Sequence, residues 1–355
     1  MAEKRLMYGN HAVAEGVIYA GCRFFAGYPI TPQNEIPEYM SIRMNEEGGV
    51  FLQTESEIAA INMLFGASAA GKRAMTSSSS PGISLMQEGI SYIAGADMPV
   101  LVVNVVRGGP GLGNIAPAQS DYYQATRGGG HGDYFTITLA PNSAQELFEF
   151  PRLGFELAEK YRNPVLILAD GLLGQMMEPV EFSYEPIDPK TLPEKEWALS
   201  GCKGRERRVV RSYDLRPGKL EEWNWRRYEK YEKIKKSEQR HEAKDCDDAD
   251  LVVVAYGTCA RVSGAAVRMA RDKGFKVGLF RPITLWPFPW DALGDMSKRI
   301  ENFLVVEMSC GQMIDDVKLA TECRSKISFQ GRPGGGVPIP PEVYQKIEEI
   351  LGGAR

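Results

Sequence analysis

The sequence is poor in the residues that most often bind metals. Six cysteines and three histidines occur among 355 residues. No two cysteines are separated by only two residues, so the CxxC spacing of zinc and iron–sulfur sites is absent. A disulfide framework is also unexpected in a chain of this size without a secretory signal. The sequence therefore predicts isolated reduced thiols and no metal site, with any iron–sulfur cluster held by another chain.

Long apolar runs and an excess of one charge are absent too. No run reaches the roughly 18 apolar residues that span a bilayer. Residues 1–16 lack the apolar core of a signal peptide. The formal net charge of -4 creates no overall field for nucleic acid or an anionic membrane. We therefore expect a cytoplasmic protein with neither a membrane span nor a nucleic-acid partner.

Two common nucleotide-binding motifs are incomplete. Residues 66–73, GASAAGKR, approach the P-loop spacing, but Arg73 stands where the magnesium-binding hydroxyl is needed. These glycines also follow a predicted helix, whereas a P-loop precedes one. No GxGxxG follows the first predicted strand. The sequence thus excludes P-loop nucleotide hydrolysis and disfavours a nicotinamide site.

Short β-rich runs alternate with helical patterns along the first half of the chain. The run 100–106, VLVVNVV, is apolar on both faces, as a buried parallel strand is. This alternation predicts an α/β fold, with a parallel sheet covered by helices on both faces. Strands are expected at 23–28, 50–53, 74–77, 100–106 and 164–169, and helices at 12–20, 56–70, 83–94 and 144–161.

Composition divides the chain into three parts. Residues 1–185 form the first α/β domain, and the alternation resumes in a smaller one at 248–355. The segment 186–247 is dense in charge, but acidic residues interrupt its basic ones. This favours a solvated linker with helical pieces over a nucleic-acid surface. Trp223 and Trp225 indicate that the linker packs against something.

The turn after the first predicted strand contains a candidate ligand-binding hydroxyl. Prolines on both sides of Thr31 stiffen the sequence GYPITP at residues 27–32. Such a turn would hold the hydroxyl at the carboxyl edge of the sheet, where α/β folds bind ligands. The alternative is an ordinary turn in which Thr31 caps the next helix.

Acidic residues open the next predicted helix. In Thr54-Glu55-Ser56-Glu57 the Thr-x-x-Glu spacing is that of a capping box, which would occupy Glu57 structurally. The alternative is a half-buried carboxyl group, since the helix that follows is apolar, and burial favours its protonated form.

Three further loops carry polar groups. The run 77–82, SSSSPG, is suited to binding an anion at a helix N-terminus, or is a hydroxyl-rich cap. Arg107 follows the buried strand and precedes a glycine-rich loop, so it either binds a carboxylate or lies exposed on the surface. His131, in GGGHGD, is either an acid–base group or a loop residue.

The order of these motifs resembles the α-type subunit of the 2-oxoacid:ferredoxin oxidoreductases. It rests on YPITP, ESE, TSSSSPGISLMQEG, VNVVRGGPGLG, GGGHGDY and PVLILADG, followed by AYGT, RPITLWPFP and VVEMSCGQM. Only the charged linker contributes nothing to the resemblance. RGGPGLGNIAPAQSDYYQATRGGGHGDY and DGLLGQMMEPVEF are most similar to the branched-chain type, which acts on 2-oxoisovalerate.

The resemblance implies roles for particular residues. Residues 1–185 would be the pyrimidine-type domain of a thiamine-diphosphate fold, and 248–355 a transketolase C-terminal-like domain. Glu57 would be the catalytic carboxyl that touches the aminopyrimidine, with Glu55 as its rival. Substrate carboxylate binding falls to Thr31 and Arg107. The residues expected beside the cofactor are Tyr28, Pro29, Ser79 and Ser80.

The resemblance also implies partner subunits. A β subunit with a GDG…NN motif would hold the diphosphate and Mg²⁺, since Ala169-Asp170-Gly171 lacks the first glycine and the asparagines. A γ subunit and a ferredoxin-like subunit with [4Fe-4S] clusters would complete a dimer of hetero-oligomers. Thiamine diphosphate would then be shared between chains, and coenzyme A would be the co-substrate.

The implied reaction is the coenzyme A-dependent oxidative decarboxylation of a 2-oxoacid to acyl-CoA and CO₂, with electrons passed to ferredoxin, and reversible in principle. A branched-chain substrate is expected, unless Arg127 binds the distal carboxylate of 2-oxoglutarate. The alternatives are the α subunit of a 2-oxoglutarate enzyme, the β subunit of a lipoyl-dependent 2-oxoacid dehydrogenase, and a non-catalytic subunit.

Overall fold

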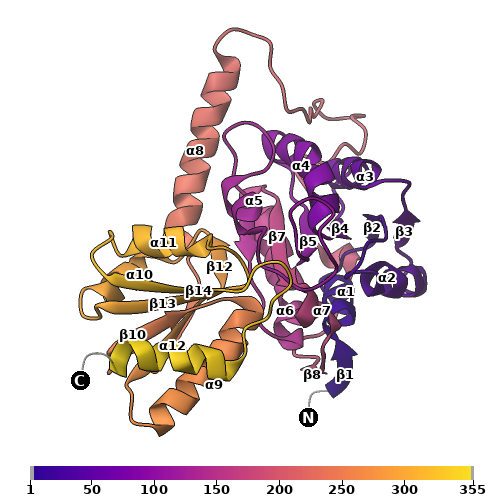
Figure 1. Ribbon diagram of the computed structural model, residues 1–355. Coiled ribbons are helices and arrows are strands. Elements are labelled where there is room, and N and C mark those ends of the chain that lie inside the picture. The colour runs from indigo at the N-terminus through magenta and orange to yellow at the C-terminus, as the bar shows by residue number, and fades with distance from the viewer. Residues whose placement is uncertain (1–3, 353–355) are drawn as a thin grey trace.

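Two separate sheets organise the chain. The computed structural model describes residues 4–352. A seven-stranded sheet lies in the first part and a five-stranded sheet in the second (Figure 1). A small antiparallel ribbon of β1 (Lys4–Tyr8) and β8 (Met177–Glu181) stands beside the first sheet. The predicted α/β class is confirmed.

The larger sheet has the strand order β12-β6-β7-β5-β4-β2-β3. All its neighbouring strands are parallel except β12, which runs antiparallel to β6. Most of its interior strands are fully buried, as their apolar runs predict. The bounds are β2 Phe24–Gly27, β3 Val50–Gln53, β4 Met75–Ser78, β5 Leu101–Val106, β6 Ile137–Leu139, β7 Val165–Asp170 and β12 Thr284–Trp286.

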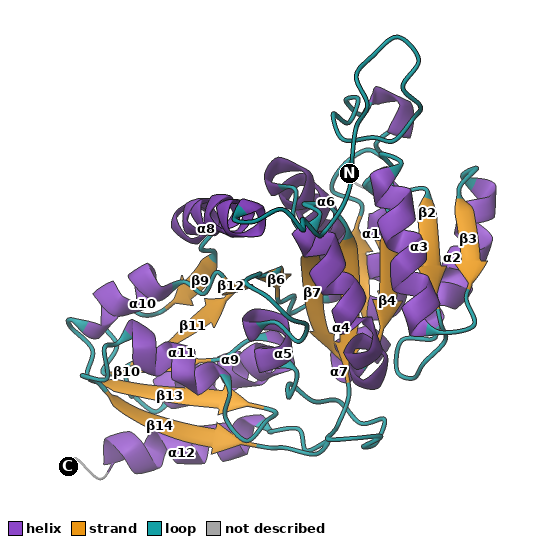
Figure 2. Ribbon diagram, turned by 90° about the horizontal axis from the view of Figure 1, so that it is seen from above, coloured by secondary structure: helices purple, strands orange, loops and turns teal. Residues whose placement is uncertain are grey.

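Helices cover both faces of this sheet, as predicted. One layer contains α1, α2 and α6, and the other contains α3 and α4 (Figure 2). Because the strands are parallel, each connection must cross over, and the helices fill these crossovers. The bounds are α1 Gly9–Tyr19, α2 Glu35–Glu46, α3 Glu57–Ala69, α4 Ser80–Gly95, α5 Tyr122–Arg127, α6 Ala144–Tyr161 and α7 Gly171–Gln175.

The smaller sheet has the order β14-β13-β10-β11-β9, with only β9 antiparallel. Helix α9 packs with α12, and α10 packs with α11. The bounds are β9 His241–Lys244, β10 Leu251–Val254, β11 Val277–Pro282, β13 Asn302–Glu307, β14 Lys326–Gly331, α9 Gly257–Asp272, α10 Trp290–Ser297, α11 Met313–Ala320 and α12 Pro340–Gly352.

Strand pairing crosses the predicted boundary at residue 247. Strand β9 lies within the predicted linker but pairs with β11, and β12 lies in the predicted second domain but pairs with β6. The ring of Trp286, in β12, stacks 4.6 Å from that of Phe135 and is buried. Burial of this large ring explains why the strand joins the first sheet. Hydrophobic periodicity alone does not reveal such a distant partner.

The charged connector includes a 3-10 turn at Pro189–Thr191 and the long helix α8 (Lys219–Ser237). Tyr231 and Ile234 bury one face of α8, which is otherwise polar. Trp223 also packs, between arginine side chains, but Trp225 is 62% exposed. The linker therefore packs against the first domain, as expected, although Trp225 itself is exposed. The stretch is partly a docked helix, because Tyr231 and Ile234 are buried on one of its faces.

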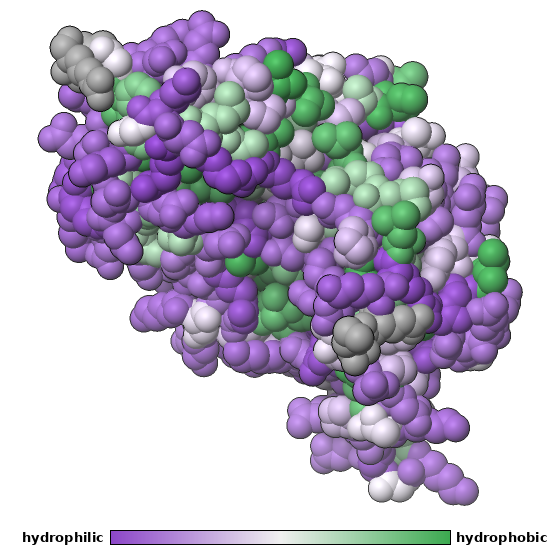
Figure 3. Space-filling view, turned by 90° about the horizontal axis from the view of Figure 1, so that it is seen from below, coloured by the Kyte–Doolittle hydropathy of each residue, from purple (hydrophilic) through white to green (hydrophobic). Residues whose placement is uncertain are grey.

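Hydrophilic residues dominate the face shown in Figure 3, and hydrophobic ones gather there in separate patches. Within residues 4–352, no helix combines the length and the apolar character needed to cross a bilayer. All six cysteines have free thiols.

A buried carboxylate joins the two parts of the molecule. Asp170, at the end of β7, accepts hydrogen bonds from the main-chain N–H groups of Leu172 and Leu173, both at 3.1 Å. It also accepts bonds from Thr258, at 3.1 Å from the main-chain nitrogen and 2.7 Å from Oγ1. Burial raises the pKa of Asp170, and these hydrogen bonds oppose that effect. The carboxylate therefore caps α7 and at the same time holds the start of α9 against it.

We expect Asp170→Ala to lower the free energy of unfolding of the isolated chain by about 3 kcal/mol, because it leaves buried donors on both parts without an acceptor. The matched control is Asp272→Ala, at the exposed end of α9, which should change stability by less than about 0.5 kcal/mol. Guanidinium titration measures both. Equal losses in the two variants would contradict a joining role for Asp170.

Candidate active site

The carboxyl ends of β2, β4 and β5 form the edge at which the predicted site residues meet. These three strands are neighbours in the sheet and run parallel. Their following segments carry Thr31, Ser79 and Arg107 respectively. Parallel strands bring their carboxyl ends to one edge, so side chains distant in sequence come together there.

The side chain of Arg107 is buried and held by main-chain carbonyls. Its Nη1 donates to the carbonyl of Thr31 at 2.9 Å and its Nη2 to that of Leu112 at 3.1 Å. The main-chain N–H of Arg107 donates to Ser80 Oγ at 3.1 Å. Its Nε is buried without a hydrogen-bond partner among the described residues. The alternative of an exposed loop arginine is therefore wrong, since only 7% of the residue is exposed.

Thr31 lies beside this guanidinium and is half-buried. Its Oγ1 accepts a hydrogen bond from Asn34 Nδ2 at 3.2 Å. Asn34 is the residue that precedes α2, and its side chain makes no capping bond to that helix. Thr31 therefore does not cap α2. Its hydroxyl hydrogen can be donated to another group.

The capping box predicted for Thr54 and Glu57 does not form. Ser56 caps α3 instead, because its Oγ accepts from the main-chain N–H of Ala59 at 3.2 Å. The hydroxyl of Thr54 lies 3.2 Å from the carbonyl of Gly27 and 2.9 Å from that of Ser56. Glu57 is therefore not held in a cap and stands at the first residue of the helix.

Burial separates the two candidate carboxyl groups. Glu57 is 6% exposed, whereas Glu55 is exposed. Glu57 Oε1 and Ser78 Oγ lie against Gly82, where an added Cβ would come within 2.5 Å and 2.0 Å of them. Glycine at this position is what allows the carboxyl group and the serine to approach the start of α4.

Unpartnered polar atoms gather at the same place. The Oγ atoms of Ser78 and Ser79 are buried, and no residue within 4–352 bonds to them. Because most buried polar atoms in folded proteins have partners, such orphans beside a buried carboxyl group indicate a place for a polar ligand. Ser79 precedes the first residue of α4, and its side chain caps nothing.

Two buried polar residues beside this group were missed by the sequence analysis. Asn104 Nδ2 donates to Asp121 Oδ2 at 2.9 Å, and Asp121 also bonds the hydroxyl of Ser80. Burial raises the pKa of Asp121, and these two bonds oppose the shift. Asn104 is the one polar residue in the run predicted to be apolar on both faces. A buried amide requires a hydrogen-bond partner, so Asn104 in this apolar run was a signal for a polar partner nearby, such as Asp121.

Gln33 was missed as well. It is buried, and its Oε1 accepts from Ser77 Oγ at 2.6 Å, while its Nε2 donates to the carbonyl of Tyr28 at 3.3 Å. It therefore ties the turn after β2 to the end of β4. Tyr28 and Pro29 are exposed on this turn, on the approach to Thr31.

The structure places His131 and Arg127 apart from this group. His131 is exposed, and its ring lies 6.5 Å from that of Tyr92, near the end of α4. Tyr92 is about 18 Å along the helix from Ser80, at 1.5 Å per residue. Arg127 Nη2 donates to Asp316 in α11 at 2.8 Å, so its charge is already paired.

The residues present do not suit a resident metal. No group of three or more histidine, cysteine, aspartate or glutamate side chains within residues 4–352 could hold an ion. Asp170, from the incomplete Ala169-Asp170-Gly171 motif, has its oxygens occupied by α7 and α9. It is therefore not free to bind Mg²⁺.

Comparison with known proteins identifies the family. The model described as "Pyruvate flavodoxin/ferredoxin oxidoreductase, thiamine diP-bdg" matches residues 15–242, and "Pyruvate:ferredoxin oxidoreductase core domain II" matches residues 249–343. The chain belongs to the 2-oxoacid:ferredoxin oxidoreductase family. The resemblance carried by the order of the motifs is thereby confirmed, and with it an oxidoreductase subunit built on a thiamine-diphosphate-binding fold.

Relatives match the chain over its whole length. The ketoisovalerate oxidoreductase subunit VorB of Methanothermobacter marburgensis is 48% identical, over 98% of both chains. The 2-oxoglutarate synthase subunit KorA of the same organism is 38% identical, over 98% of this chain and 99% of its own. Both are named as subunits, so members of this 2-oxoacid:ferredoxin oxidoreductase family act in multi-subunit enzymes.

Solved structures give the same assignment. The 2-oxoglutarate:ferredoxin oxidoreductase of Magnetococcus marinus, with 2-oxoglutarate, coenzyme A and succinyl-CoA bound, matches with a TM-score of 0.87 at 27% identity. The match covers 98% of this chain, which spans 65% of that longer one. A split-gene transketolase matches with a TM-score of 0.61 at 12% identity, which shows the fold alone.

The site fits the cofactor that the family model names. Thiamine diphosphate carries an aminopyrimidine ring, whose nitrogens pair with a carboxyl group and with hydroxyl or main-chain partners. Glu57 and the orphaned hydroxyls of Ser78 and Ser79 offer that set at the edge of the sheet. Within residues 4–352, no group of histidine, cysteine, aspartate or glutamate side chains would hold the Mg²⁺ that accompanies the diphosphate.

We expect Glu57→Gln in the assembled enzyme to slow exchange of the cofactor's C2 proton by about 100-fold or more, the effect of losing a positioned acid–base group. Glu55→Gln should exchange at nearly the unmodified rate, because Glu55 is exposed. Exchange in deuterated buffer, followed by NMR, measures both.

Thermal unfolding of both variants provides the control. Neither side chain caps α3, so we expect little change in stability. Normal exchange in Glu57→Gln together with slow exchange in Glu55→Gln would show that the other carboxyl group contacts the ring.

Proposed function

We propose that the chain is the α-type subunit of a cytoplasmic, branched-chain 2-oxoacid:ferredoxin oxidoreductase, which forms acyl-CoA and CO₂ from 2-oxoacids such as 2-oxoisovalerate. One observation carries the proposal. Glu57, two orphaned serine hydroxyls and the unpaired Nε of Arg107 converge at the carboxyl edge of the sheet, in a chain related over its full length to such subunits.

The proposed reaction needs an ionisable carboxyl group and a fixed cation on this chain. When bound, thiamine diphosphate supplies a nucleophilic carbon for attack on the ketone of the substrate. Glu57, buried at the start of α3, would hold a proton on the aminopyrimidine and so assist removal of the C2 proton. Its freedom from capping supports this role.

Arg107 and Thr31 would orient the substrate carboxylate. The guanidinium is fixed by two carbonyl oxygens, which position it without neutralising its charge. A cation held in place before the substrate arrives loses little side-chain freedom on binding. Thr31 can donate its hydroxyl hydrogen from the neighbouring turn. Loss of the oriented carboxylate as CO₂ then removes the charge from a partly dry site.

Asp121 and Asn104 would position this arginine indirectly. Asp121 bonds the hydroxyl of Ser80, and Ser80 accepts the main-chain N–H of Arg107. Asn104 fixes Asp121 from within β5. The chain of contacts runs from the rigid interior of the sheet to the residue that would meet the substrate.

The surroundings of Arg127 support an apolar substrate. Asp316 is fully buried and accepts from Arg127, from the hydroxyl of Tyr122 at 2.5 Å and from Trp290 Nε1 at 3.2 Å. Breaking this ion pair would leave a buried carboxylate without its cation. Residues 108–126 contain no lysine or arginine. A distal carboxylate such as that of 2-oxoglutarate would therefore be unpaired here, which is costly.

Exposed apolar residues near the same edge of the sheet support the proposal that a partner subunit docks there. This subunit would hold the diphosphate and Mg²⁺. Several large apolar residues near the proposed site are exposed. Burial of such residues by another chain would also exclude water from the site. They are Ile58 on α3, Leu85 on α4, and Leu112 and Ile115 on the loop after Arg107.

Electron transfer would require partners with iron–sulfur clusters, a γ subunit and a ferredoxin-like subunit. The six cysteines of this chain are free, and no cluster of ligands occurs in residues 4–352. Coenzyme A would accept the acyl group. A lipoyl-dependent dehydrogenase subunit is the alternative in which a tethered dithiol, instead of clusters, receives the electrons.

Purified alone, the chain should be colourless, contain no stoichiometric iron and not decarboxylate 2-oxoacids. The physical reason is that Asp170 is occupied and the thiols are dispersed. Absorbance, metal analysis and a CO₂-release assay measure this, and activity should appear on adding the partner subunits. Brown colour with bound iron in the isolated chain would contradict the proposed division of labour.

The assembled enzyme should prefer 2-oxoisovalerate over 2-oxoglutarate by about tenfold or more in kcat/KM, because an unpaired buried carboxylate is costly. The comparison includes pyruvate and uses one electron acceptor throughout. Arg127→Ala should leave the ratio unchanged, as should the control Arg152→Ala, which removes an exposed ion pair on α6. A preference for 2-oxoglutarate that Arg127→Ala abolishes would identify a 2-oxoglutarate enzyme instead.

A further inference from the structure

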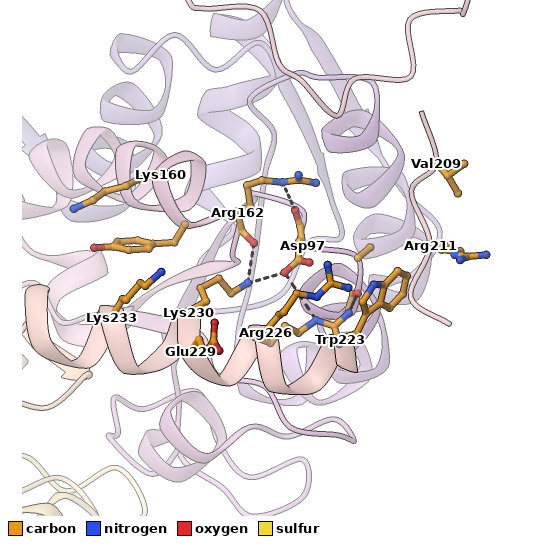
Figure 4. Close-up of a pocket in the computed structure, with 14 residues that line it drawn as sticks. Asp97, Lys160, Arg162, Val209, Arg211, Trp223, Arg226, Glu229, Lys230 and Lys233 are labelled. Carbon is orange, nitrogen blue, oxygen red and sulfur yellow. Dashed lines mark hydrogen bonds and ion pairs between the residues drawn. The ribbon is translucent and has the colours of Figure 1, made fainter. Parts of the chain in front are cut away.

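A cavity lies far from the proposed active site. It has a volume of about 460 Å³ and lies between α8 and the first sheet's helices (Figure 4). Its walls are one face of α8, the turn Gly95–Asp97, the end of α6 and the segment 209–211. Gly95 ends the helix that Ser80 begins, about 22 Å away along its axis. The volume is typical of small-molecule sites.

The charge of this cavity is opposite to that of the whole chain. Seven of its 14 lining residues are basic and two, Asp97 and Glu229, are acidic, a formal charge of +5. The chain as a whole carries -4. Positive charge is therefore concentrated in this cavity. The seven basic residues are Lys160, Arg162, Arg211, Arg226, Arg227, Lys230 and Lys233.

Three of these cations have close carboxylate partners. Lys160 pairs with Glu238 at 2.7 Å and Arg211 with Asp214 at 2.9 Å. Lys230 pairs with Asp97 at 2.7 Å, as the dashed lines of Figure 4 show.

Glu229 is the one lining carboxylate left for the other four cations, so three positive charges remain in excess. Within residues 4–352, Arg226 and Lys233 have no ion pair, and Arg162 Nε donates only to the carbonyl of Asp97, at 3.1 Å. Arg227 lies 3.9 Å from the carboxylate that Lys230 already holds, and its buried Nε makes no hydrogen bond.

Burial fixes part of this group in place. Arg227 is 7% exposed, and its guanidinium donates to Asn224 and to the carbonyl of Gly95. Burial lowers the pKa of Lys230; Asp97 opposes the shift, while Arg227 and Arg162 add to it. A bound anion beside Lys230 would favour its charged form and so oppose the effect of burial.

The aromatic rings of the cavity are already covered. The guanidinium groups of Arg211 and Arg227 both lie 5.5 Å from the centroid of the Trp223 ring. Lys160 lies 4.7 Å from the ring of Tyr161, whose hydroxyl donates to Glu238. Both rings that line the cavity therefore already have cationic neighbours. The cavity therefore offers positive charge and N–H donors, which suit phosphate oxygens.

We propose that this cavity binds a small polyphosphate group, two or three linked phosphates, and recognises the phosphates without recognising an attached base. The three excess positive charges suit the negative charge of such a group. The cavity opens to solvent, but its volume of about 460 Å³ suits a small molecule better than an acidic protein segment, which requires an extended groove.

Calorimetric titration of the assembled, thiamine-diphosphate-saturated enzyme with inorganic pyrophosphate tests this. The saturated cofactor keeps the probe out of the active site. The double variant Arg226→Gln/Lys233→Gln should weaken pyrophosphate binding about tenfold or more, since two charge-assisted contacts are lost. The control Lys236→Gln makes the same kind of charge change on α8, outside the cavity, and should bind normally. Both sets of side chains are exposed, so folding should be unaffected.

Three results would overturn the proposal. One is no saturable pyrophosphate binding. Another is an affinity for pyrophosphate that equals the affinity for sulfate at the same ionic strength and is unchanged in the double variant, as a diffuse surface charge would produce. The third is ADP binding more than tenfold tighter than pyrophosphate, which would indicate recognition of a base.

Discussion

The buried hydrogen bonds between the two parts of the chain constrain everything else in the molecule. Asp170 bonds both α7 and the start of α9, and Gln119 bonds the carbonyl of Tyr256 and the main-chain N–H of Met308. Gln119 belongs to the loop that begins at Arg107. The second sheet therefore fixes the far end of the loop whose beginning carries the proposed substrate-binding cation. Because buried polar groups are costly when unpaired, this arrangement tolerates little displacement.

The proposed active site depends on which polar groups the fold leaves unpaired. Arg107 is held by neutral carbonyls, so it keeps its charge for a ligand. Arg127, by contrast, meets a buried carboxylate and is neutralised. Both arginines follow the same strand, yet of the two only Arg127 has a carboxylate partner among the described residues. This difference, more than the number of arginines, supports an apolar branched substrate over one with a second carboxylate.

The polyphosphate site that we propose also depends on which charged groups the fold leaves unpaired. It lies at the opposite end of α4 from the proposed active site. Glu229 on α8 and Asp97 in the turn after α4 provide too few carboxylates for the cations around them. Charge density in a connector usually means a solvated surface. Here Tyr231 and Ile234 dock the helix, which turns part of that surface into a wall of a cavity.

The sequence by itself determined the α/β class, the apolar interior strands and the order of motifs that identifies the family. These features are local, because periodicity and turn chemistry are written in neighbouring residues. Its motifs also marked Thr31, Glu57 and Arg107 as candidates. It left open whether each was structural, since a capping box and a buried carboxyl group have the same local pattern.

Only the tertiary structure decided those alternatives. The hydroxyl of Thr54 is drawn to the carbonyl of Gly27 on a neighbouring strand, which leaves the cap to Ser56 and Glu57 free. Strand β12 joined the first sheet across the predicted boundary, and Asp316 claimed Arg127 from 189 residues away. Such partners depend on sheet order and on the packing of distant helices. No local pattern encodes them, because the energy of each contact exists only once the chain has folded.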